Sequence, residues 1–429
     1  MVRFPGIRPL NEMEKRRLGF LIDGALQGIV NTLLAGIFLS GFLLEIGAGE
    51  MVIGLLTTCG SWCMLLSVPG TALFKRAKNR QLLLTGLMAF SRLTICACVL
   101  LPLVITDRTV LISAVAALVV LGNAAFAIFS MGYSVVTMEL LPPNVRNSVV
   151  TQRIFASRVT LAVTAILMGL LLDAFRKSLL GFQIVFGTSF FFAIFNTLTI
   201  WKLCAQLEHK EAAERREGAQ ILTPLKDWSY LKYLIFVFLF FLISYMGVSY
   251  TSVYLLKELG LSYGITSFLT FLNYLCLMVF TFPWSRLERR FGMRAVLFSS
   301  AILVFLEFLF DPMASHGNFL PVLVGQLASG IGNAGFNISL VNYRYALMPE
   351  KGRTAYEAWY MVAFGVAVLG GSVLGGGMMG LTERLLPGVF QNQYQLLFLL
   401  VVALGLLMTG LMFLGPKKLR LAKQEEFPH

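Results

Sequence analysis

The chain has 429 residues and a formal charge of +13, with 57% hydrophobic and only 13% charged residues. Soluble proteins carry about 25% charged residues, so this chain has too little polar surface for a water-soluble globule of 47.5 kDa. The mean hydropathy of +0.77 points the same way. Composition therefore excludes a soluble enzyme, a disordered chain and a secreted disulfide scaffold, and predicts an all-α integral membrane protein.

The residues that bind metals and cofactors are scarce or poorly placed. The three histidines lie outside the apolar runs, and the six cysteines lie inside them without a CxxC pair or a neighbouring histidine. The cationic residues are divided among the connections between hydrophobic runs, which is typical of orientation in a bilayer. We therefore expect no cofactor, no metal, no nucleic-acid partner and no enzymatic activity, and the lipid bilayer as the surrounding medium.

Twelve runs are long enough to cross a bilayer core, which needs about 20 apolar residues in a helix. Such helices satisfy their backbone hydrogen bonds internally, so hydropathy alone locates them. The predicted spans are 18–44, 51–74, 81–105, 110–138, 148–172, 181–205, 231–255, 262–284, 295–313, 319–347, 355–381 and 390–414.

Basic residues predict the orientation. The tails and the even-numbered connections, with the span ends beside them, carry 26 Lys and Arg, whereas the odd-numbered connections carry 5. Because positive charge is retained on the cytoplasmic side, both termini are expected in the cytoplasm, which requires an even number of spans. We expect a multi-pass protein of the plasma (inner) membrane.

The longest connection, 206–230, is charged and divides the chain into six spans on either side. We interpret it as a cytoplasmic linker between an N-terminal six-helix bundle, residues 1–205, and a C-terminal six-helix bundle with a short cytoplasmic tail, residues 231–429. A regulatory or binding segment is the alternative reading of the linker.

Three short motifs recur in the same order in both halves, at offsets between 207 and 214 residues. Internal repeats of this kind are typical of transporters built from two homologous half-bundles, with a pathway at their interface. The motif pairs are TALFKRAKNR at 71–80 with SRLERRFGMR at 285–294, GNAAF at 122–126 with GNAGF at 332–336, and LPPNVR at 141–146 with MPEKGR at 348–353.

These motifs and the division into six plus six spans resemble the major facilitator superfamily of transporters over essentially the whole chain. The resemblance implies two pseudo-symmetric six-helix bundles that work by alternating access. It also implies that spans 1, 4, 7 and 10 line a cavity, that spans 2, 5, 8 and 11 join the halves, and that spans 3, 6, 9 and 12 face lipid.

The basic loops depart from the family pattern. Where the family carries a glycine and an aspartate after span two, this chain has Thr71 and Lys75, and the second copy has Ser285 and Arg289. The usual salt bridges of the cytoplasmic gate are therefore not expected, although loop arginines can contact helix C-termini or lipid phosphates. Span five also lacks the Gly-Pro motif of drug/proton antiporters. The arginines of these gate loops are Arg76, Arg80, Arg146, Arg290, Arg294 and Arg353.

Polar side chains recur on one face of each span that the resemblance assigns to the cavity. At 100° per residue these positions share a face, which favours a cavity or substrate-binding role. Hydrogen bonding between helices is the alternative for each of them. The residues are Asp23, Gln27 and Asn31 in span one, Asn123 in span four, Tyr245 in span seven, and Gln326, Asn333, Asn337 and Arg344 in span ten.

Charged residues within spans are costly and need partners or water. We expect Asp23, Arg158 and Arg344 to cluster at the cytoplasmic side of the cavity and to assist gating or substrate binding, with a fixed structural ion pair as the alternative. Asp23, Glu307 and Glu357 are the candidate proton carriers.

Span eleven is rich in glycine, which permits close approach and sliding of helices. Static packing is the alternative. If the glycines serve sliding, Gly371→Leu should impair turnover more than folding.

The sequence thus predicts a monomeric secondary transporter that moves a small solute by alternating access. Arg158 and Arg344 beside a single aspartate weakly favour an anionic or zwitterionic substrate. A coupling proton or ion, or simple uniport, stays open. The alternatives are a transporter-fold sensor or assembly partner without transport, and multidrug or amphiphile efflux.

Overall fold

The computed structural model of the chain is almost entirely helical. Within its described residues the single β-pairing is an isolated bridge between Ser315 and Asn318. The structure describes residues 11–67, 69–70, 73, 77, 79–175, 178–205, 223–315, 317–349, 353–385, 393–414 and 421.

The N-terminal half follows the predicted order of spans, with two of them broken. Helices α1 and α2 together form the first span, and α3, α4 and η1 together occupy the place of the second. The elements are α1 (Glu12–Leu33), α2 (Gly36–Glu45), α3 (Glu50–Thr57), α4 (Cys59–Trp62), η1 (Cys63–Leu66), α6 (Arg80–Ala97), η2 (Cys98–Leu103), α7 (Arg108–Leu140), α8 (Pro143–Ala174) and α9 (Leu179–Cys204).

The C-terminal half begins with a short helix that lies in the predicted linker; residues 206–222 of that linker lie outside the described residues. Its elements are α10 (Thr223–Lys226), α11 (Trp228–Val253), η3 (Tyr254–Glu258), α12 (Tyr263–Phe291), α13 (Met293–Phe310), η4 (Asp311–Met313), α14 (Leu320–Leu347), α15 (Arg353–Leu385) and α16 (Gln393–Leu414).

Every predicted span coincides largely with helix over its described residues, and ten stretches of the described chain are long and apolar enough to cross a membrane. Helix α14, at the tenth predicted span, is equally long at 28 residues but carries several amide side chains. The second predicted span is broken into short helices and is in part outside the described residues. The first span breaks at Gly36, whose φ of +53° suits glycine. The fold is therefore that of an all-α integral membrane protein.

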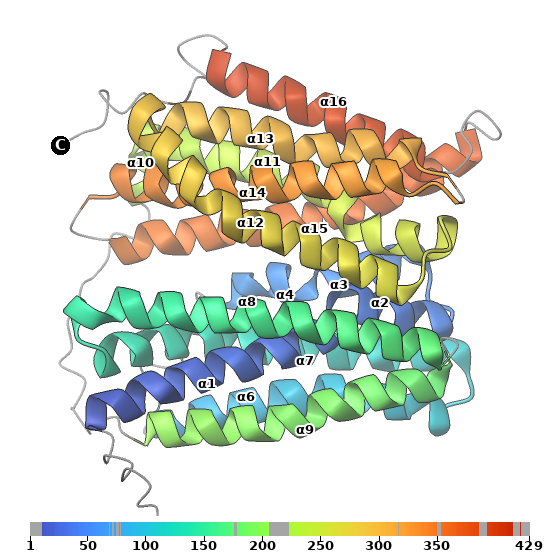
Figure 1. Cartoon of the computed structure of the whole chain (residues 1–429), viewed down its shortest axis with the longest axis horizontal. Coiled ribbons are helices and arrows are strands. Elements are labelled where there is room, and N and C mark those ends of the chain that lie inside the picture. The colour runs from blue at the N-terminus through green and yellow to red at the C-terminus, as the bar shows by residue number, and fades with distance from the viewer. Residues whose placement is uncertain are drawn as a thin grey trace, which may run out of the picture.

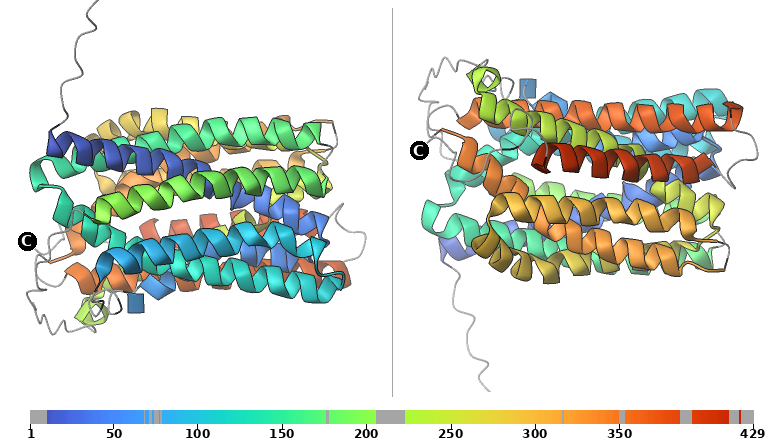
Figure 2. Two further views of the ribbon diagram at one scale, coloured as in Figure 1. Left: turned by 90° about the horizontal axis from the view of Figure 1, so that it is seen from below. Right: turned by 90° about the horizontal axis from the view of Figure 1, so that it is seen from above.

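Two groups of helices lie one above the other in Figure 1, with the N-terminal elements below and α10–α16 above. Figure 2 views each group from its own side. Helix α1 begins, α9 ends and α16 ends at the same side of the molecule, at the left of Figure 1. We call this side the inner end and the opposite side the outer end. The arrangement agrees with an even number of crossings.

Close helix contact in the N-terminal half places α1 against α8. A Cβ atom on Gly24 would lie 2.5 Å from the carbonyl oxygen of Arg153, and one on Gly28 would meet the carbonyl oxygen of Ser157. The two backbones can touch only because these positions lack side chains. This contact brings the side chain of Arg153 to the polar face of α1.

The glycines of α15 pack chiefly within their own half. A Cβ atom on Gly371 would meet the carbonyl oxygen of Leu242 in α11, and one on Gly375 would lie 2.5 Å from that of Met246. Gly365 instead faces the N-terminal half, where a Cβ atom would lie 2.7 Å from Leu65. The expectation of a sliding role for Gly371 is therefore wrong, because its close neighbour is α11.

We predict that Gly371→Leu destabilises the fold by about 1–3 kcal/mol, because a side chain inserted against the α11 backbone overpacks a tight contact. The thermal unfolding midpoint of the purified protein measures the effect. The matched control is Gly377→Leu on the same helix, since Gly377 has no atom within 4 Å of its added Cβ. Equal midpoints for the two variants would contradict this packing.

Candidate functional site

The two halves meet along two helix pairs. Helix α8 packs against α12, and α15 packs against α3, α4 and η1. These elements correspond to spans five, eight, eleven and two, so the expected contact helices are confirmed. Helix α11 also contacts α2 and α3.

At the outer end, Asp173 of α8 joins the halves. Its carboxylate accepts hydrogen bonds from the backbone N–H groups of Tyr263 at 2.8 Å and Gly264 at 2.7 Å. These are the first two residues of α12, whose N–H groups have no partner within the helix. The negative charge also suits the positive end of the helix dipole. One helix of the N-terminal half thus caps a helix of the C-terminal half.

A second link at the outer end centres on Glu50, at the start of α3. Its carboxylate lies 2.5 Å from the ammonium group of Lys257 and accepts a hydrogen bond of 2.5 Å from the side chain of Gln393. The Tyr263 ring also lies 6.0 Å from that of Phe182 in α9. The outer end is therefore closed by charged, polar and aromatic contacts.

Hydroxyl groups join the halves near the middle of the bundle. The Thr58 and Ser372 hydroxyl oxygens lie 3.0 Å apart, and Ser249 lies 2.7 Å from Ser372. The hydroxyl groups of Ser61 and Tyr245 are 3.4 Å apart. These contacts link α4 and the adjoining turn at Thr58 with α11 and α15.

At the inner end the hydrogen bonds between described residues stay within each half. Arg146 donates to the carbonyl oxygens of Met138 and Leu141, and Glu288 accepts from Ser339 and Asn342. No hydrogen bond or ion pair between two described residues joins the halves at this end. Among the described residues, the polar links between the halves thus lie at the middle and the outer end.

Asp23, in the first polar stripe, lies at the centre of a buried network inside the N-terminal half. Its side chain is 2% exposed. It accepts hydrogen bonds from the Tyr133 hydroxyl at 2.6 Å, from Arg153 at 2.8 Å and from the Asn196 amide at 2.9 Å. The Arg153 guanidinium also lies 4.9 Å from the Tyr133 ring centre. The carboxylate is thus fully partnered.

The rest of that stripe is bonded in the same half. Arg153 also donates to the Gln27 side chain, and Arg92 donates to the Asn31 side chain at 2.6 Å. The sequence did not single out Arg153, which lies six residues into the fifth predicted span, 148–172. The signal that was available is the glycine pair on α1, which lets α8 approach this face.

The expected cluster of Asp23, Arg158 and Arg344 is wrong. Asp23 pairs with Arg153 in the N-terminal half. Arg158 stacks over the Tyr274 ring of α12 at 4.7 Å, at the contact between the halves. Arg158 lies five residues beyond Arg153, about 140° further round the helix, so it points to α12 instead of α1.

Arg344 lies among aromatic rings in the C-terminal half. Its guanidinium is 3.8 Å from the Tyr360 ring centre, and its Nε atom is 3.4 Å from the Glu357 carboxylate. The side chain is 9% exposed, and its Nε and Nη1 atoms have no hydrogen-bond partner among the described residues. Buried guanidinium donors without acceptors are costly, so this group is suited to an incoming anion.

The amides of α14 divide between two environments. Gln326 is buried and donates to Glu307 at 2.6 Å, whereas Asn333 donates to the Ser329 hydroxyl at 3.1 Å. Asn337 is exposed and donates to the backbone carbonyl of Asn333 at 2.8 Å. Gln326 therefore belongs to an interhelical network, which is the alternative that the sequence left open.

The remaining cavity candidates lie near the middle of the bundle. Asn123 donates to the carbonyl of Val119 at 2.8 Å and lies beside Gly60, whose added Cβ would be 3.2 Å from its oxygen. Tyr245 reaches Ser61 across the halves and lies 6.3 Å from the Phe364 ring. Both residues thus lie beside the second span.

The gate-loop arginines serve several contacts. Arg146 and Arg294 donate to carbonyls in the last turns of α7 and α16, as expected for contacts with helix C-termini. Arg80 lies 3.4 Å from Glu139, and Arg290 lies 5.3 Å from the Phe291 ring. Arg76 and the side chain of Arg353 lie outside the described residues.

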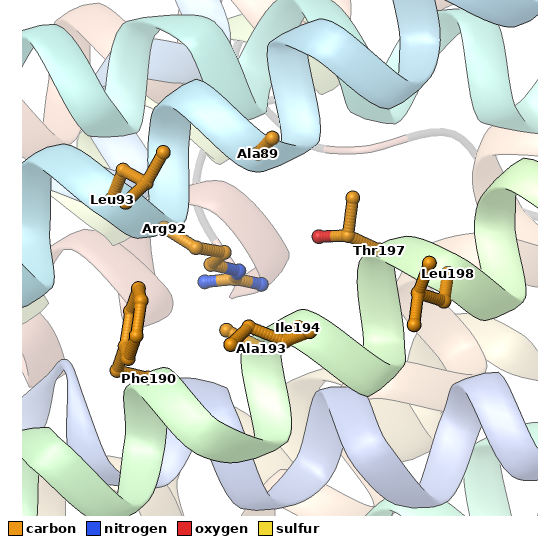
Figure 3. Close-up of a pocket in the computed structure, with 8 residues that line it drawn as sticks. All are labelled: Ala89, Arg92, Leu93, Phe190, Ala193, Ile194, Thr197 and Leu198. Atoms are coloured by element: carbon orange, nitrogen blue, oxygen red, sulfur yellow. The ribbon is translucent and has the colours of Figure 1, made fainter.

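A groove of about 230 Å³ lies between α6 and α9, away from the contact between the halves. Its walls are almost wholly apolar, and the Arg92 guanidinium points into it (Figure 3). Arg92 is 4% exposed, bonds to Asn31 and lies 4.5 Å from the Phe126 ring. These partners hold the buried charge within the N-terminal half.

The fold and the paired halves define a multi-span helical membrane transporter. The chain belongs to the major facilitator superfamily, whose family model matches residues 20–263 and again 233–428. The resemblance that its repeats indicated is thereby confirmed.

Three solved structures illustrate the similarity in fold. A bacterial homologue of the iron transporter ferroportin, in the inward-facing state, is 17% identical with a TM-score of 0.72, over 92% of this chain and 97% of that one. A D-xylose-proton symporter is 13% identical with a TM-score of 0.70, over 95% and 98%. The nucleoside transporter NupG is 14% identical with a TM-score of 0.68, over 92% and 97%. No curated protein matches the sequence.

We predict that Asp23→Asn lowers the free energy of unfolding by about 3 kcal/mol, because it leaves the Arg153 guanidinium without its counter-charge. Titration with a denaturing detergent measures the loss. The double variant Asp23→Asn/Arg153→Gln should recover part of it, since no lone charge remains.

The matched control is Glu139→Gln, which removes an exposed ion pair with Arg80 and should cost less than about 1 kcal/mol. Similar losses for Asp23→Asn and Glu139→Gln would show that the buried network is not a special support of this half.

Proposed function

We propose that the protein is a secondary transporter that moves a small solute by alternating access, with the pathway between its halves. The observation that carries this proposal is the set of polar links between described residues that hold the halves together at the middle and the outer end. A transporter closed on one side needs contacts that can be exchanged for others when the opposite side closes.

The moving bodies would be residues 1–205 and 231–429, joined by the linker 206–230. Each half contains an ion pair of its own: Asp23 with Arg153 in one, and Glu357 with Arg344 in the other. Rotation of the halves as units leaves these two pairs intact. We propose a monomer in the plasma membrane, with both termini in the cytoplasm and no cofactor.

The proposed substrate is an anionic or zwitterionic small molecule. Arg344 has unpartnered guanidinium nitrogens beside Tyr360, and Arg158 has no acceptor among the described residues and rests on Tyr274. Guanidinium groups bind carboxylates and phosphates through paired charged hydrogen bonds. Rings beside them add stacking surface for the body of the solute.

A test of this function starts with a thermal-shift screen of small carboxylates, phosphates and neutral solutes, because a ligand of the folded state stabilises it. Compounds that raise the midpoint are then tested for flux in liposomes. We expect an anionic solute among them to be transported. A protein that binds such ligands without any flux would be the sensor that the sequence left as an alternative.

Arg344→Gln should weaken binding of that anion about tenfold or more, the loss expected for one charged hydrogen bond. Arg158→Gln should act in the same direction. The matched control is Arg289→Gln, which removes the same charge from an exposed position on α12. Wild-type affinity in both Arg344→Gln and Arg158→Gln would contradict an anionic substrate.

A further inference from the structure

Two carboxyl groups lie buried at the outer end of α13. Glu307 is in its last turns and is 9% exposed, and Asp311 begins η4 and is 0% exposed. The two positions are four residues apart, so their side chains lie on the same face of the helix. Neither takes part in the contact between the halves described above.

Asp311 has no partner for its charge among the described residues. Neither of its carboxylate oxygens has a hydrogen-bond partner in that part of the chain, although both are buried. Its backbone carbonyl, by contrast, accepts a hydrogen bond of 2.7 Å from the Tyr254 hydroxyl. Glu307 accepts a hydrogen bond of 2.6 Å from the Gln326 amide.

The described groups that face this pair offer no cation. Helices α12 and α14 contribute amides and a hydroxyl, whereas η3 and α16 contribute tyrosines, a glutamine and one further acid. No described Lys, Arg or His forms an ion pair with either carboxyl group. Gln326 and Ser329 face Glu307, and Tyr254 bonds to the Asp311 backbone. The residues that contact these neighbours or adjoin the pair are Asn273, Glu258, Tyr394 and Gln395.

A buried carboxylate without a counter-charge is strongly disfavoured, and two close together are disfavoured further. Binding a proton neutralises such a group without any additional ligand. A metal ion would instead need several oxygen ligands, and the group that Gln326 presents to Glu307 is an N–H donor. The surroundings therefore favour a proton over a metal ion.

The carboxyl pair is connected to the contact between the halves. The Asn273 amide of α12 donates to the backbone and side-chain oxygens of Gln326, at 3.1 and 3.2 Å. Gln326 in turn donates to Glu307. The residue after Asn273 is Tyr274, over which Arg158 of the N-terminal half stacks. A change at Glu307 thus reaches α12 through two hydrogen-bonded amides.

We propose that Glu307 and Asp311 form a proton-binding site that is coupled, through Gln326 and Asn273, to the position of α12. A proton from water at the outer side adds to a carboxylate oxygen and later returns to water. Protonation makes the net charge of the pair one unit less negative, and release of the proton restores it. The proposal rests on the proposed transport function and assigns its coupling ion.

Infrared spectroscopy of the purified protein tests proton occupancy directly, through the carbonyl stretching band of protonated carboxylic acids. We expect this band at neutral pH, a shifted band in Glu307→Gln or Asp311→Asn, and its loss in the double variant. The matched control is Glu45→Gln, an exposed carboxyl at the same end, which should leave the band unchanged. A double variant with the wild-type band would overturn the site.

Hydrogen–deuterium exchange at the start of α12 tests the coupling. The N–H groups of Tyr263 and Gly264 bond to Asp173, so their exchange reports opening of the outer end. After correction for the intrinsic effect of pH, we expect their protection to depend on pH in the wild type and Glu45→Gln, and to lose this dependence in Glu307→Gln. Equal pH dependence in Glu307→Gln would overturn the coupling.

Both measurements need only the proton as ligand. A protein that passes them but shows no flux in liposomes would contradict the transport function and leave the proton site standing. The infrared band or the exchange protection of Tyr263 and Gly264 could instead change with sodium concentration and not with pH. That result would overturn the assignment of the proton as the ligand.

Discussion

The carboxylate of Asp173 and the first two N–H groups of α12 belong to different halves of the chain, yet they bond as if in one helix cap. Helix ends leave such groups unsatisfied, and lipid offers no water to replace a partner. The bond therefore stabilises the contact between the halves at the outer end. Together with the Glu50–Lys257 pair, it distinguishes this end from the other among the described residues.

The buried charges follow a complementary rule. Asp23 and Arg153 satisfy one another between α1 and α8, so the N-terminal half keeps its ion pair in any arrangement of the halves. Glu307 and Asp311 have no such partner among the described residues, and Arg344 keeps unused donors. Satisfied charges support a rigid half, whereas unsatisfied ones mark places where a proton or an anion completes the structure.

Hydropathy predicted the spans, because it reflects a local property of the chain in a bilayer. The helices that join the halves were instead implied by the family resemblance that the repeats indicated. The site was less predictable. Arg153 and Arg158 are both arginines of one helix, and only the close approach of α1 at Gly24 decides which meets Asp23. Likewise, the glycines of α15 predicted a tight contact but not that Gly371 faces α11. Such choices depend on the tertiary neighbours, which hydropathy does not contain.

Spin-label distance measurements in lipid test alternating closure most directly. One labelled pair would replace Glu45 and Phe268, at the outer ends of α2 and α12, and the other Glu139 and Arg289, at the inner ends of α7 and α12; all four are exposed. In the Asp173→Asn background, which weakens the outer cap, the account predicts a longer outer distance together with a shorter inner one. Distances that stay unchanged, or that lengthen at both ends, would contradict it.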